Sequence, residues 1–354
     1  MLSYKIFSSF DENCYKDWKE ISHKGNYNFF QSFDFLKKIR SQNKNSLKII
    51  SIYYNNKIIM FAPLEIKRYL IFNFLQWIGT EISDYCNPII INDIDNYLHE
   101  KEFKKIWKDI LNNIGEFDLI LLNNQPSKIN GFNNPFTKYL KSIEISKIYQ
   151  IKLDSSSEDY YKNLKLRDKK KFYEIQRTIN KYKNLQKETN VIFEVINLPN
   201  DEIDFKKVIE NKVYQLSKKG VKNKLNSEFV EIFKDLIKQS KKKYVLASLK
   251  VNDEIISTCV GITSNNVFYY YIPMIISEKY NNFKPGKILT LQIIEWCFKN
   301  NIKCFDFGLG DEKYKENFSN YSIPIHRYIF GKNFSGKMLI SILKIIFYKK
   351  KFNS

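Results

Sequence analysis

Residues that bind metals or form cross-links are scarce in this sequence. Three histidines and five cysteines occur among 354 residues, and no two cysteines form a Cys-x-x-Cys pair. The cysteines are scattered along the chain: Cys14, Cys86, Cys259, Cys297 and Cys304. Zinc sites need clustered ligands and disulfide frameworks need paired cysteines, so no metal is expected. Buried free thiols in a reducing compartment are the favoured interpretation.

Long apolar runs are missing as well. No stretch of about 18 apolar residues occurs, so a transmembrane helix is not expected. The first residues, MLSYKIFSSFDEN, carry charges at Lys5 and Asp11 and contain no apolar core of signal-peptide length. We therefore expect a cytoplasmic protein. An apolar fraction of 44% argues against a wholly disordered chain, and the length allows two domains.

Acidic residues are outnumbered by basic ones. The chain has 58 Lys+Arg against 38 Asp+Glu, a formal net charge of +20. Such a charge favours a polyanionic partner, such as nucleic acid, an anionic membrane or a phosphate-rich ligand. The chain is also rich in Lys, Asn, Ile and Tyr, and a compositional bias of the genome would give the same excess. The net charge alone does not decide between these two explanations.

Turn residues between apolar runs predict two β-hairpins, at 47–66 and 244–263. Asn55-Asn56 and Asn252-Asp253 interrupt these runs, and both pairs tolerate the positive φ of a tight turn. A third strand over 267–274 follows the second hairpin.

A helix and a short buried strand follow each hairpin. The helices are predicted at 99–114 and 286–301 from apolar residues at helical spacing, and the strands at 117–124 and 304–310. Because the order of elements repeats, we predict a structural duplication with two α/β halves of one design.

The segment between the halves, 155–189, is strongly basic. Its serines at 155–157 offer an N-cap, and Glu158 and Asp159 suit a helix N-terminus. A helix or a helix pair is therefore predicted here. Its cations, Arg167 among them, either face phosphates or form a solvated surface.

The C-terminal segment 338–348 is apolar apart from Ser341 and Lys344, and Lys349–Lys351 follow it. This segment is too short to span a bilayer. It is either a helix that lies in the interface of an anionic membrane or a helix docked on the protein core.

Two neighbouring motifs carry the candidate chemistry, and the first is the segment 281–289. Pro285 and Gly286 form a turn before a helix whose first N–H groups lack intrahelical partners, and Lys284 and Lys287 flank the turn. Amide donors, helix dipole and cations together suit a pyrophosphate. A Pro-Gly turn before a helix is also common as a purely structural feature.

The second motif is FDFGLGDEKYKENF at 305–318, a buried strand that runs into a glycine loop and a short helix. Asp306 is expected at the carboxyl end of the strand, where open α/β sheets bind ligands. Gly308 and Gly310 allow the backbone to pass close to a ligand. Tyr314 and Lys315 follow on the helix.

These residue types suit acyl transfer, in which the attacking amine loses a proton and the departing thiolate is stabilised or protonated. Asp306 would serve as the base if it is desolvated, and Tyr314 would protonate the leaving sulfur. Lys315 would stabilise the oxyanion or hold a phosphate of the acceptor. Each residue also has a structural interpretation: Asp306 as a turn former, Tyr314 as a packing residue and Lys315 as a solvated charge.

Together with FKPGKILTLQIIEW at 283–296, the second motif resembles the C-terminal signature of bacterial GNAT-related acyltransferases of the CelD / BioF2-like group. These are relatives of the FemAB peptidyltransferases. Further segments are similar to the same group: Gln31-Ser32-Phe33, MFAPLEI at 60–66, WIGTEISDYCNPII at 77–90 and the basic stretch 165–177. The resemblance covers most of the chain, from about residue 25 to residue 331.

The resemblance implies an α/β protein with tandem GNAT-like, FemAB-like domains, each a mixed β-sheet flanked by helices. Residues 1–150 would form a degenerate acceptor-side half, and 151–190 a basic helical connector. Residues 191–333 would form the donor-binding, catalytic half, and 334–354 a basic amphipathic tail.

The resemblance also implies a set of site residues. The donor would be acetyl-CoA or another acyl-CoA, transferred directly and without a metal. The donor would contact Lys284, Gly286, Lys287, Ile288, Gly308 and Gly310. The acceptor would contact Asp84, Tyr85, Arg167 and Tyr271.

The function expected on these grounds is an acyl-CoA-dependent N- or O-acyltransferase for a sugar, a nucleotide sugar or a cell-surface glycan precursor of polysaccharide biosynthesis. The enzyme would be cytoplasmic or peripheral to the inner membrane. Two alternatives stay open: a FemAB-like transferase that takes an amino acid from charged tRNA, and a non-catalytic basic protein that binds nucleic acid or a membrane surface.

Overall fold

The computed structural model describes residues 1–41, 45–154, 156–200, 205–218, 225, 227–239, 243–310 and 312–342. The chain forms two compact units. The first contains residues 1–146 and the chain from Ile323 onward, and the second contains residues 147–322.

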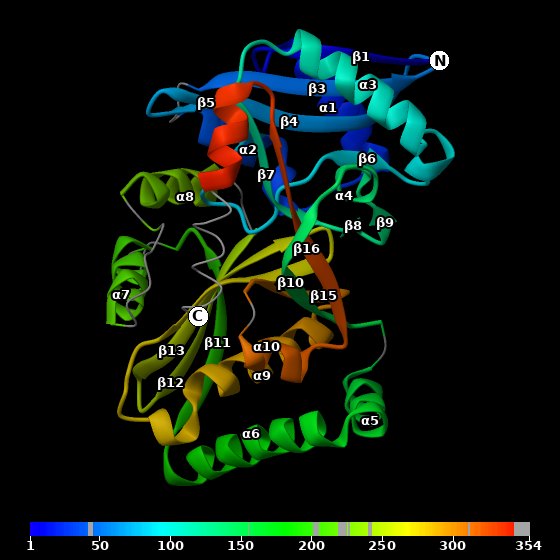
Figure 1. Cartoon of the computed structure of the whole chain (residues 1–354). Helices are drawn as coiled ribbons and strands as arrows, with labels where there is room; N and C mark the ends of the chain where they lie inside the picture. The colour runs from blue at the N-terminus through cyan, green and yellow to red at the C-terminus, as the bar shows by residue number, and fades with distance from the viewer. Residues whose placement is uncertain are drawn as a thin grey trace. The chain divides into compact units, whose positions relative to one another are not determined.

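The first unit is built on a mixed β-sheet in the order β1-β3-β4-β5-β7-β16 (Figure 1). The strands are β1 (Leu2–Phe7), β3 (Ser46–Tyr54), β4 (Lys57–Tyr69), β5 (Phe72–Trp77), β7 (Leu119–Pro126) and β16 (Tyr321–Gly331). Neighbours are antiparallel except β5 and β7. Short strands β2 (Gly25–Asn26) and β6 (Ile89–Ile91) pair with each other, and β6 also pairs with β4. The helices are α1 (Glu12–Lys24), α2 (Phe33–Ser41), α3 (Glu100–Asn113) and α4 (Pro135–Tyr139).

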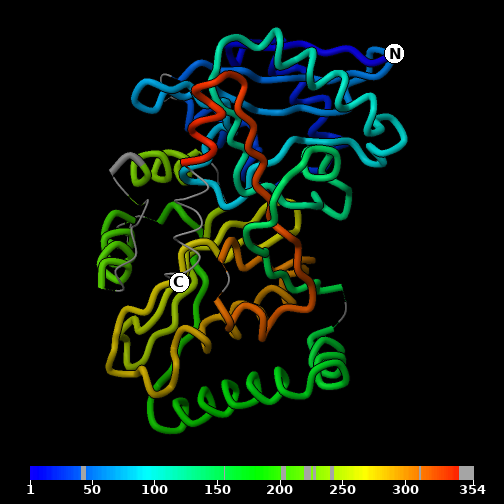
Figure 2. Tube along the Cα trace, viewed as in Figure 1, coloured from blue at the N-terminus to red at the C-terminus, as the bar shows by residue number. Residues whose placement is uncertain are grey.

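The second unit repeats this plan with the order β11-β12-β13-β14-β15-β10. The strands are β10 (Ile143–Lys152), β11 (Val191–Leu198), β12 (Tyr244–Val251), β13 (Glu254–Ser264), β14 (Val267–Ile275) and β15 (Cys304–Leu309). Only β14 and β15 pair in parallel. The helices are α5 (Ser157–Arg167), α6 (Lys169–Glu188), α7 (Phe205–Lys218), α8 (Ser227–Gln239), α9 (Pro285–Lys299) and α10 (Lys313–Phe318). The trace of α6 runs beside that of α9, far later in the chain (Figure 2).

Each sheet therefore has four consecutive antiparallel strands, a crossover helix and a fifth strand parallel to the fourth, as the predicted duplication requires. The sixth strand of each sheet differs from the order expected from the sequence. Strand β10 follows the first half of the chain but pairs with β15, and β16 follows the second half but pairs with β7. The division of the structure consequently falls at residues 146/147 and 322/323, whereas the sequence places it near 150 and 333.

Both predicted hairpin turns are present, and their backbone explains their composition. Asn55 and Asn56 have φ of 48° and 65°, and Asn252 and Asp253 have φ of 47° and 67°. Two successive residues with positive φ are the requirement of a tight turn that matches the strand twist, and Asn and Asp adopt this conformation more readily than most residues.

The helices pack through the apolar positions that the sequence shows. In α3, Phe103, Ile106, Trp107 and Ile110 are buried in the core of the first unit. The predicted basic segment forms the helix pair α5 and α6, with the Ser156 side chain as N-cap of α5. Helix α9 is buried on most sides, since eight of its fifteen residues are inaccessible in the core of the second unit. A helix that is covered on both flanks holds its N-terminus in a fixed place.

Binding groups for metals do not gather in the described part of the chain. All five cysteines are buried and free, and the described residues contain no cluster of three potential metal ligands. No helix within the described ranges has both the length and the apolar character to cross a membrane.

The C-terminal tail begins as a helix at residues 334–342, and Lys344 and Lys349–Lys351 lie outside the described residues. Asn333 fixes the start of this helix, because its side chain donates to Asp118 Oδ1 (2.7 Å) and accepts from the Gly336 N–H (2.8 Å). A side chain at Gly336 would collide with the Asp118 backbone. The opposite face of the helix exposes Phe334, Met338 and Ile342.

A buried carboxyl group in the first unit gives a test of this packing. Glu65 is 1% exposed, and it accepts a hydrogen bond from Gln76 Nε2 (3.0 Å). Burial raises the pKa of this carboxyl above its ordinary value of 4.5. The unfolded chain therefore loses the Glu65 proton at lower pH than the folded protein, and stability falls as pH rises above 4.5 through the folded pKa. We predict that Glu65→Gln removes this loss, measured as urea midpoints at acidic and neutral pH. The exposed Glu102→Gln should leave the pH dependence unchanged, and equal pH dependence in Glu65→Gln and the wild type would contradict the prediction.

Candidate active site

The second unit opens where β14 and β15 stop pairing. The two strands are joined in parallel only from Val267 to Tyr269 on β14 and from Cys304 to Asp306 on β15. Beyond this point β14 continues to Ile275 and β15 to Leu309 without pairing with each other. Two parallel strands that diverge leave a gap between their carboxyl ends, and this is where α/β sheets bind ligands.

A β-bulge decides which tyrosine faces the gap. Gly261 pairs with Tyr270 and Val260 with Ile272, so Tyr271 is an additional residue on β14. The Tyr270 ring packs on Phe305 and Phe307, on the α9 side of the sheet, and its hydroxyl accepts from Thr290 Oγ1 (3.0 Å).

The Tyr271 ring lies on the opposite face. It stacks on Phe233 and Phe229 of α8, at centroid distances of 5.2 and 6.5 Å. The sequence predicts an acceptor contact for Tyr271, but the residue that lines the gap is Tyr270. Strand alternation alone allows either assignment, and only the bulge settles it.

The N-terminus of α9 forms one side of the gap. Lys284 adopts φ 58° and Pro285 occupies the first turn, while the N–H groups of Lys287 and Ile288 bond to the Lys284 carbonyl. No side chain caps this end, so the Gly286 N–H and the positive end of the dipole are available to an anion.

Cations surround the same helix end. Burial and the nearby Lys284 ammonium lower the pKa of Lys287, and Lys181 of α6 contributes in the same direction. The Lys181 side chain donates to the Asn282 carbonyl. Three ammonium groups that repel one another beside an uncapped helix N-terminus would be relieved by a bound anion.

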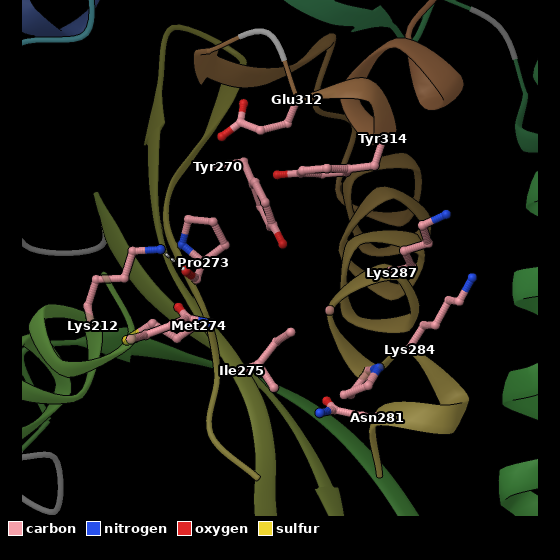
Figure 3. A pocket seen from close by; sticks show the side chains of 13 residues that line it. Lys212, Tyr270, Pro273, Met274, Ile275, Asn281, Lys284, Lys287, Glu312 and Tyr314 are labelled. Carbon is pink, nitrogen blue, oxygen red and sulfur yellow. Dashed lines mark hydrogen bonds between the residues drawn. The ribbon is translucent and has the colours of Figure 1, made fainter. Parts of the chain in front are cut away.

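A cavity of about 390 Å³ occupies the gap (Figure 3). It is lined by Tyr270 and Pro273–Ile275 of β14, Asn281 and Lys284–Lys287 at the start of α9, Lys212 and Gln215 of α7, and Glu312 and Tyr314. The two motifs that the sequence singles out thus border one cavity. Of the predicted site residues, Lys284, Gly286, Lys287 and Tyr314 lie in its wall.

Tyr314 points its hydroxyl toward Tyr270 and β14, whereas the ammonium groups of Lys284 and Lys287 point away from β14 (Figure 3). The Tyr314 ring packs edge-on against Phe307 at 6.2 Å. Burial raises the pKa of the Tyr314 phenol above its ordinary value, and the Glu312 carboxylate adds to this shift. The phenol consequently stays protonated at neutral pH and is able to donate a proton.

Asp306 does not line this cavity. Its carboxylate is 1% exposed and lies in the middle of β15. One oxygen accepts from Gln150 Nε2 of β10 (2.7 Å), and the other accepts from the Gly308 N–H (2.8 Å). The structure therefore favours the structural interpretation, in which Asp306 shapes the turn after it, over the predicted role as base.

Gly308, Gly310 and Lys315 form the loop after β15. Gly308 and Gly310 have φ of 71° and 126°, a conformation that side chains disfavour. Lys315 is 4% exposed, and its ammonium donates to the Leu309 carbonyl (2.8 Å) and to Glu312 Oε2 (2.8 Å). These residues build the loop from within, and none of the three lines the cavity.

The Ile288 side chain is also structural. It is fully buried in the core of the second unit, so the predicted donor contact is limited to its backbone. The apolar spacing of α9 already placed Ile288 on the buried face.

Arg167 lies in a different hollow. Its guanidinium donates to the Ser319 and Asn320 carbonyls (both 3.2 Å), and it lines a second cavity of about 280 Å³ with Lys152 and Tyr321. The structure does not bring Arg167 to the cavity of α9.

Asp84 and Tyr85 belong to the first unit. The Tyr85 ring is buried against Phe30, and its carbonyl accepts from Gln31 Nε2 (3.1 Å). The acceptor role of Asp84 and Tyr85 stays a prediction.

Of the cavity residues that were not predicted from the sequence, three are ionisable: Lys212, Tyr270 and Glu312. Lys212 donates to the Pro273 carbonyl (2.5 Å). Pro273 lies on the part of β14 that does not pair with β15. Glu312 stands in the predicted second motif, and its position one turn before Lys315 could have indicated an ion pair. Lys212 is about 60 residues earlier in the chain than Pro273, and no local signal connects the two.

Comparisons with known proteins identify a domain in this part of the chain. Residues 169–316 match the family model of the acetyltransferase (GNAT) domain. No curated protein sequence matches the chain.

Solved structures share the fold at low sequence identity. FemX has 9% identity and a TM-score of 0.59, and the match covers 93% of this chain and 97% of that chain. L-PGS from Bacillus licheniformis has 11% identity and a TM-score of 0.54, with coverage of 93% and 94%. A tandem GNAT protein from the clavulanic acid biosynthesis pathway has 7% identity and a TM-score of 0.50, with coverage of 94% and 99%.

The tandem GNAT, FemAB-like fold expected from the sequence is confirmed. The matched segment includes the first motif and residues 305–316 of the second. The match places a GNAT-type acetyltransferase domain at residues 169–316.

A buried and an exposed residue of α9 give a stability test of this helix. Ile288→Ala should lower the free energy of unfolding by about 2–5 kcal/mol, since it leaves a cavity in a buried core. The exposed Lys299→Ala, on the same helix, should change it by about 0.5 kcal/mol at most. Urea denaturation followed by circular dichroism measures both. Equal effects of the two substitutions would contradict the buried position of Ile288.

Proposed function

We propose that the protein is an acyl-CoA-dependent N- or O-acyltransferase and that the donor occupies the cavity between β14 and α9. The observation that carries this proposal is that the uncapped, lysine-flanked N-terminus of α9 and the Tyr314 hydroxyl border one cavity. The first is a site for a diphosphate and the second is a proton donor, which are the two functions that a coenzyme A thioester requires.

The donor fits the cavity by its chemistry. Its diphosphate would accept from the Gly286 N–H at the start of α9, with the Lys287 ammonium on the same helix turn. Pro273, Met274 and Ile275 give the cavity an apolar side for the pantetheine chain. At Gly286 the backbone is open, since the nearest atom to an added Cβ is Ile275 Cγ1 at 3.5 Å.

The reaction would be a direct transfer. A nucleophile attacks the thioester carbonyl, the carbon–sulfur bond breaks and the thiolate of coenzyme A leaves. The Tyr314 hydroxyl, which stays protonated because burial raises the pKa of the phenol, would give its proton to the departing sulfur. The structural loop that Asp306, Gly308, Gly310 and Lys315 build would hold Tyr314 in place.

The acceptor that we propose is an amine or hydroxyl of a sugar, a nucleotide sugar or a cell-surface glycan precursor, in line with the resemblance of the two motifs. Within the second unit, Arg167 is the proposed acceptor contact. The pair of cations Arg167 and Lys152 in the second cavity would suit a phosphate of such an acceptor.

An aminoacyl-tRNA donor is the second candidate. The cluster of Lys181, Lys284 and Lys287 favours it, since these cations would hold a nucleic acid backbone as well as a diphosphate. The two donors separate in one experiment. Competition by tRNA that weakens steeply with salt would support the second candidate, and tRNA without effect on acetyl-CoA binding would support the first.

Donor affinity tests the proposed site directly. In isothermal titration calorimetry with acetyl-CoA, Lys287→Ala should weaken binding about 10-fold, or about 1.4 kcal/mol, through loss of a cation beside the diphosphate. Gly286→Ala should have a similar effect, because its methyl group would stand between the donor and the helix N-terminus while the fold accepts it.

Lys187→Ala is the matched control, since it removes the same charge from an exposed position near the end of α6. Unchanged affinity in Lys287→Ala and Gly286→Ala would place the donor elsewhere. Failure of the wild type to bind any acyl-CoA would refute the proposed function.

Peripheral membrane association is a further part of the proposal. Phe334, Met338 and Ile342 expose 76%, 54% and 49% of their surface on one face of the terminal helix. A continuous apolar face followed by lysines suits the interface of an anionic membrane. Substitution of all three by Ser should reduce cosedimentation with phosphatidylglycerol vesicles at least several-fold. Equal partitioning of this variant and the wild type would contradict membrane association through this face.

A further inference from the structure

Glu312 is the one carboxylate among the described residues that line the cavity. It stands between the end of β15 and the start of α10 and is exposed on the cavity side. The Tyr314 and Tyr270 hydroxyls and the Lys212 ammonium line the same cavity (Figure 3). Since Asp306 is enclosed in β15, Glu312 is the carboxylate with access to a bound substrate.

The Lys315 ammonium holds the Glu312 carboxylate in place. Its ammonium is buried, with 5% of the side chain exposed, and it bonds to Glu312 Oε2 and to the Leu309 carbonyl, both at 2.8 Å. A buried ammonium is costly unless it is paired, so this contact has a reason to persist. It also joins Leu309, the last residue of β15, to Glu312, the residue before α10.

The carboxylate packs closely on the loop backbone at Gly310. A Cβ at Gly310 would lie 2.4 Å from Glu312 Oε2 and 3.0 Å from Lys315 Nζ. The ion pair therefore packs directly on the glycine, whose φ of 126° other residues disfavour. Gly310 admits the pair, and Lys315 holds it.

We propose that Glu312 is the proton acceptor of the acyl transfer and that Lys315 is the residue that positions it. This inference rests on the proposed function. The proton leaves the attacking N–H or O–H for the Glu312 carboxylate as the new bond to the acyl carbon forms. The carbon–sulfur bond breaks, Tyr314 protonates the thiolate, and the proton on Glu312 restores the phenol or passes to solvent. Acyl group, proton and leaving group are thus all accounted for without a further reactant.

Charged and titratable groups from three neighbouring elements share the cavity or its ion pair with this carboxylate. Lys315 and Tyr314 come from α10, Tyr270 from β14, and Lys212 from α7. Lys212 is engaged with the Pro273 carbonyl and Lys315 with the loop. This leaves Glu312 as the group in the cavity wall that is able to accept a proton.

The test uses the full chain, acetyl-CoA as donor and water as acceptor, with the coenzyme A thiol as readout. Glu312→Gln should lower turnover about 100-fold or more, the range for a lost general base, with an unchanged Kd for acetyl-CoA. Glu316→Gln is the matched control. Glu316 lies on α10, the helix that follows Glu312. It pairs with Lys171 (3.3 Å) and does not line the cavity. Formate should partly restore turnover in Glu312→Ala, because it supplies the missing carboxylate.

A double-mutant cycle tests the role of Lys315. Lys315→Met should lower turnover at least 10-fold, and Glu312→Gln/Lys315→Met should be no slower than Glu312→Gln alone, because Lys315 acts through Glu312. The exposed Lys313→Met should match the wild type. If the turnover losses of the two single variants multiply in the double variant, Lys315 does not act through Glu312 and the positioning role is overturned.

The outcomes separate this inference from the proposed function. A wild type that binds and turns over acetyl-CoA, together with a Glu312→Gln variant of equal rate, would overturn the inference alone. A wild type that does not bind acetyl-CoA would contradict the proposed function and the inference with it.

Discussion

The early end of the pairing between β14 and β15 is the constraint on which the site depends. The parallel pairing of the two strands ends at Tyr269 and Asp306, so the sheet of the second unit opens between them. The buried helix α9 directs its uncapped N-terminus to this opening. One side of the cavity is therefore the edge of β14 that no longer pairs with β15, and the other is the uncapped N-terminus of α9. Both have backbone groups that a ligand can bind.

The loop after β15 is held together by polar groups that bond to one another. Asp306 holds the Gly308 N–H and Gln150, and Lys315 holds the Leu309 carbonyl and Glu312. Buried polar groups are stable only when paired, and here each pair also fixes a turn of the loop. The residues that appear catalytic by type are thus divided into two sets. Asp306 and Lys315 shape the loop, while Glu312 and Tyr314 are presented to the cavity.

Local chemistry explains what could be predicted from the sequence. The hairpin turns, the helix pair α5 and α6 and the start of α9 follow from Asn pairs, N-caps and a Pro-Gly turn, which act within a few residues. The choice of Tyr270 over Tyr271 could not be predicted, because it depends on a bulge set by pairing with β13. The enclosure of Asp306 depends on β10, which follows the other half of the chain. Glu312 was overlooked because its role depends on a buried partner.

The central claim is that an acyl-CoA donor lies in the gap between β14 and α9. A crystal structure of the protein with coenzyme A tests this most directly. The account predicts the diphosphate at the Gly286 N–H, at the start of α9, with the sulfur between Tyr270 and Tyr314. Coenzyme A bound at another surface, or side chains that fill the gap in the crystal, would contradict it.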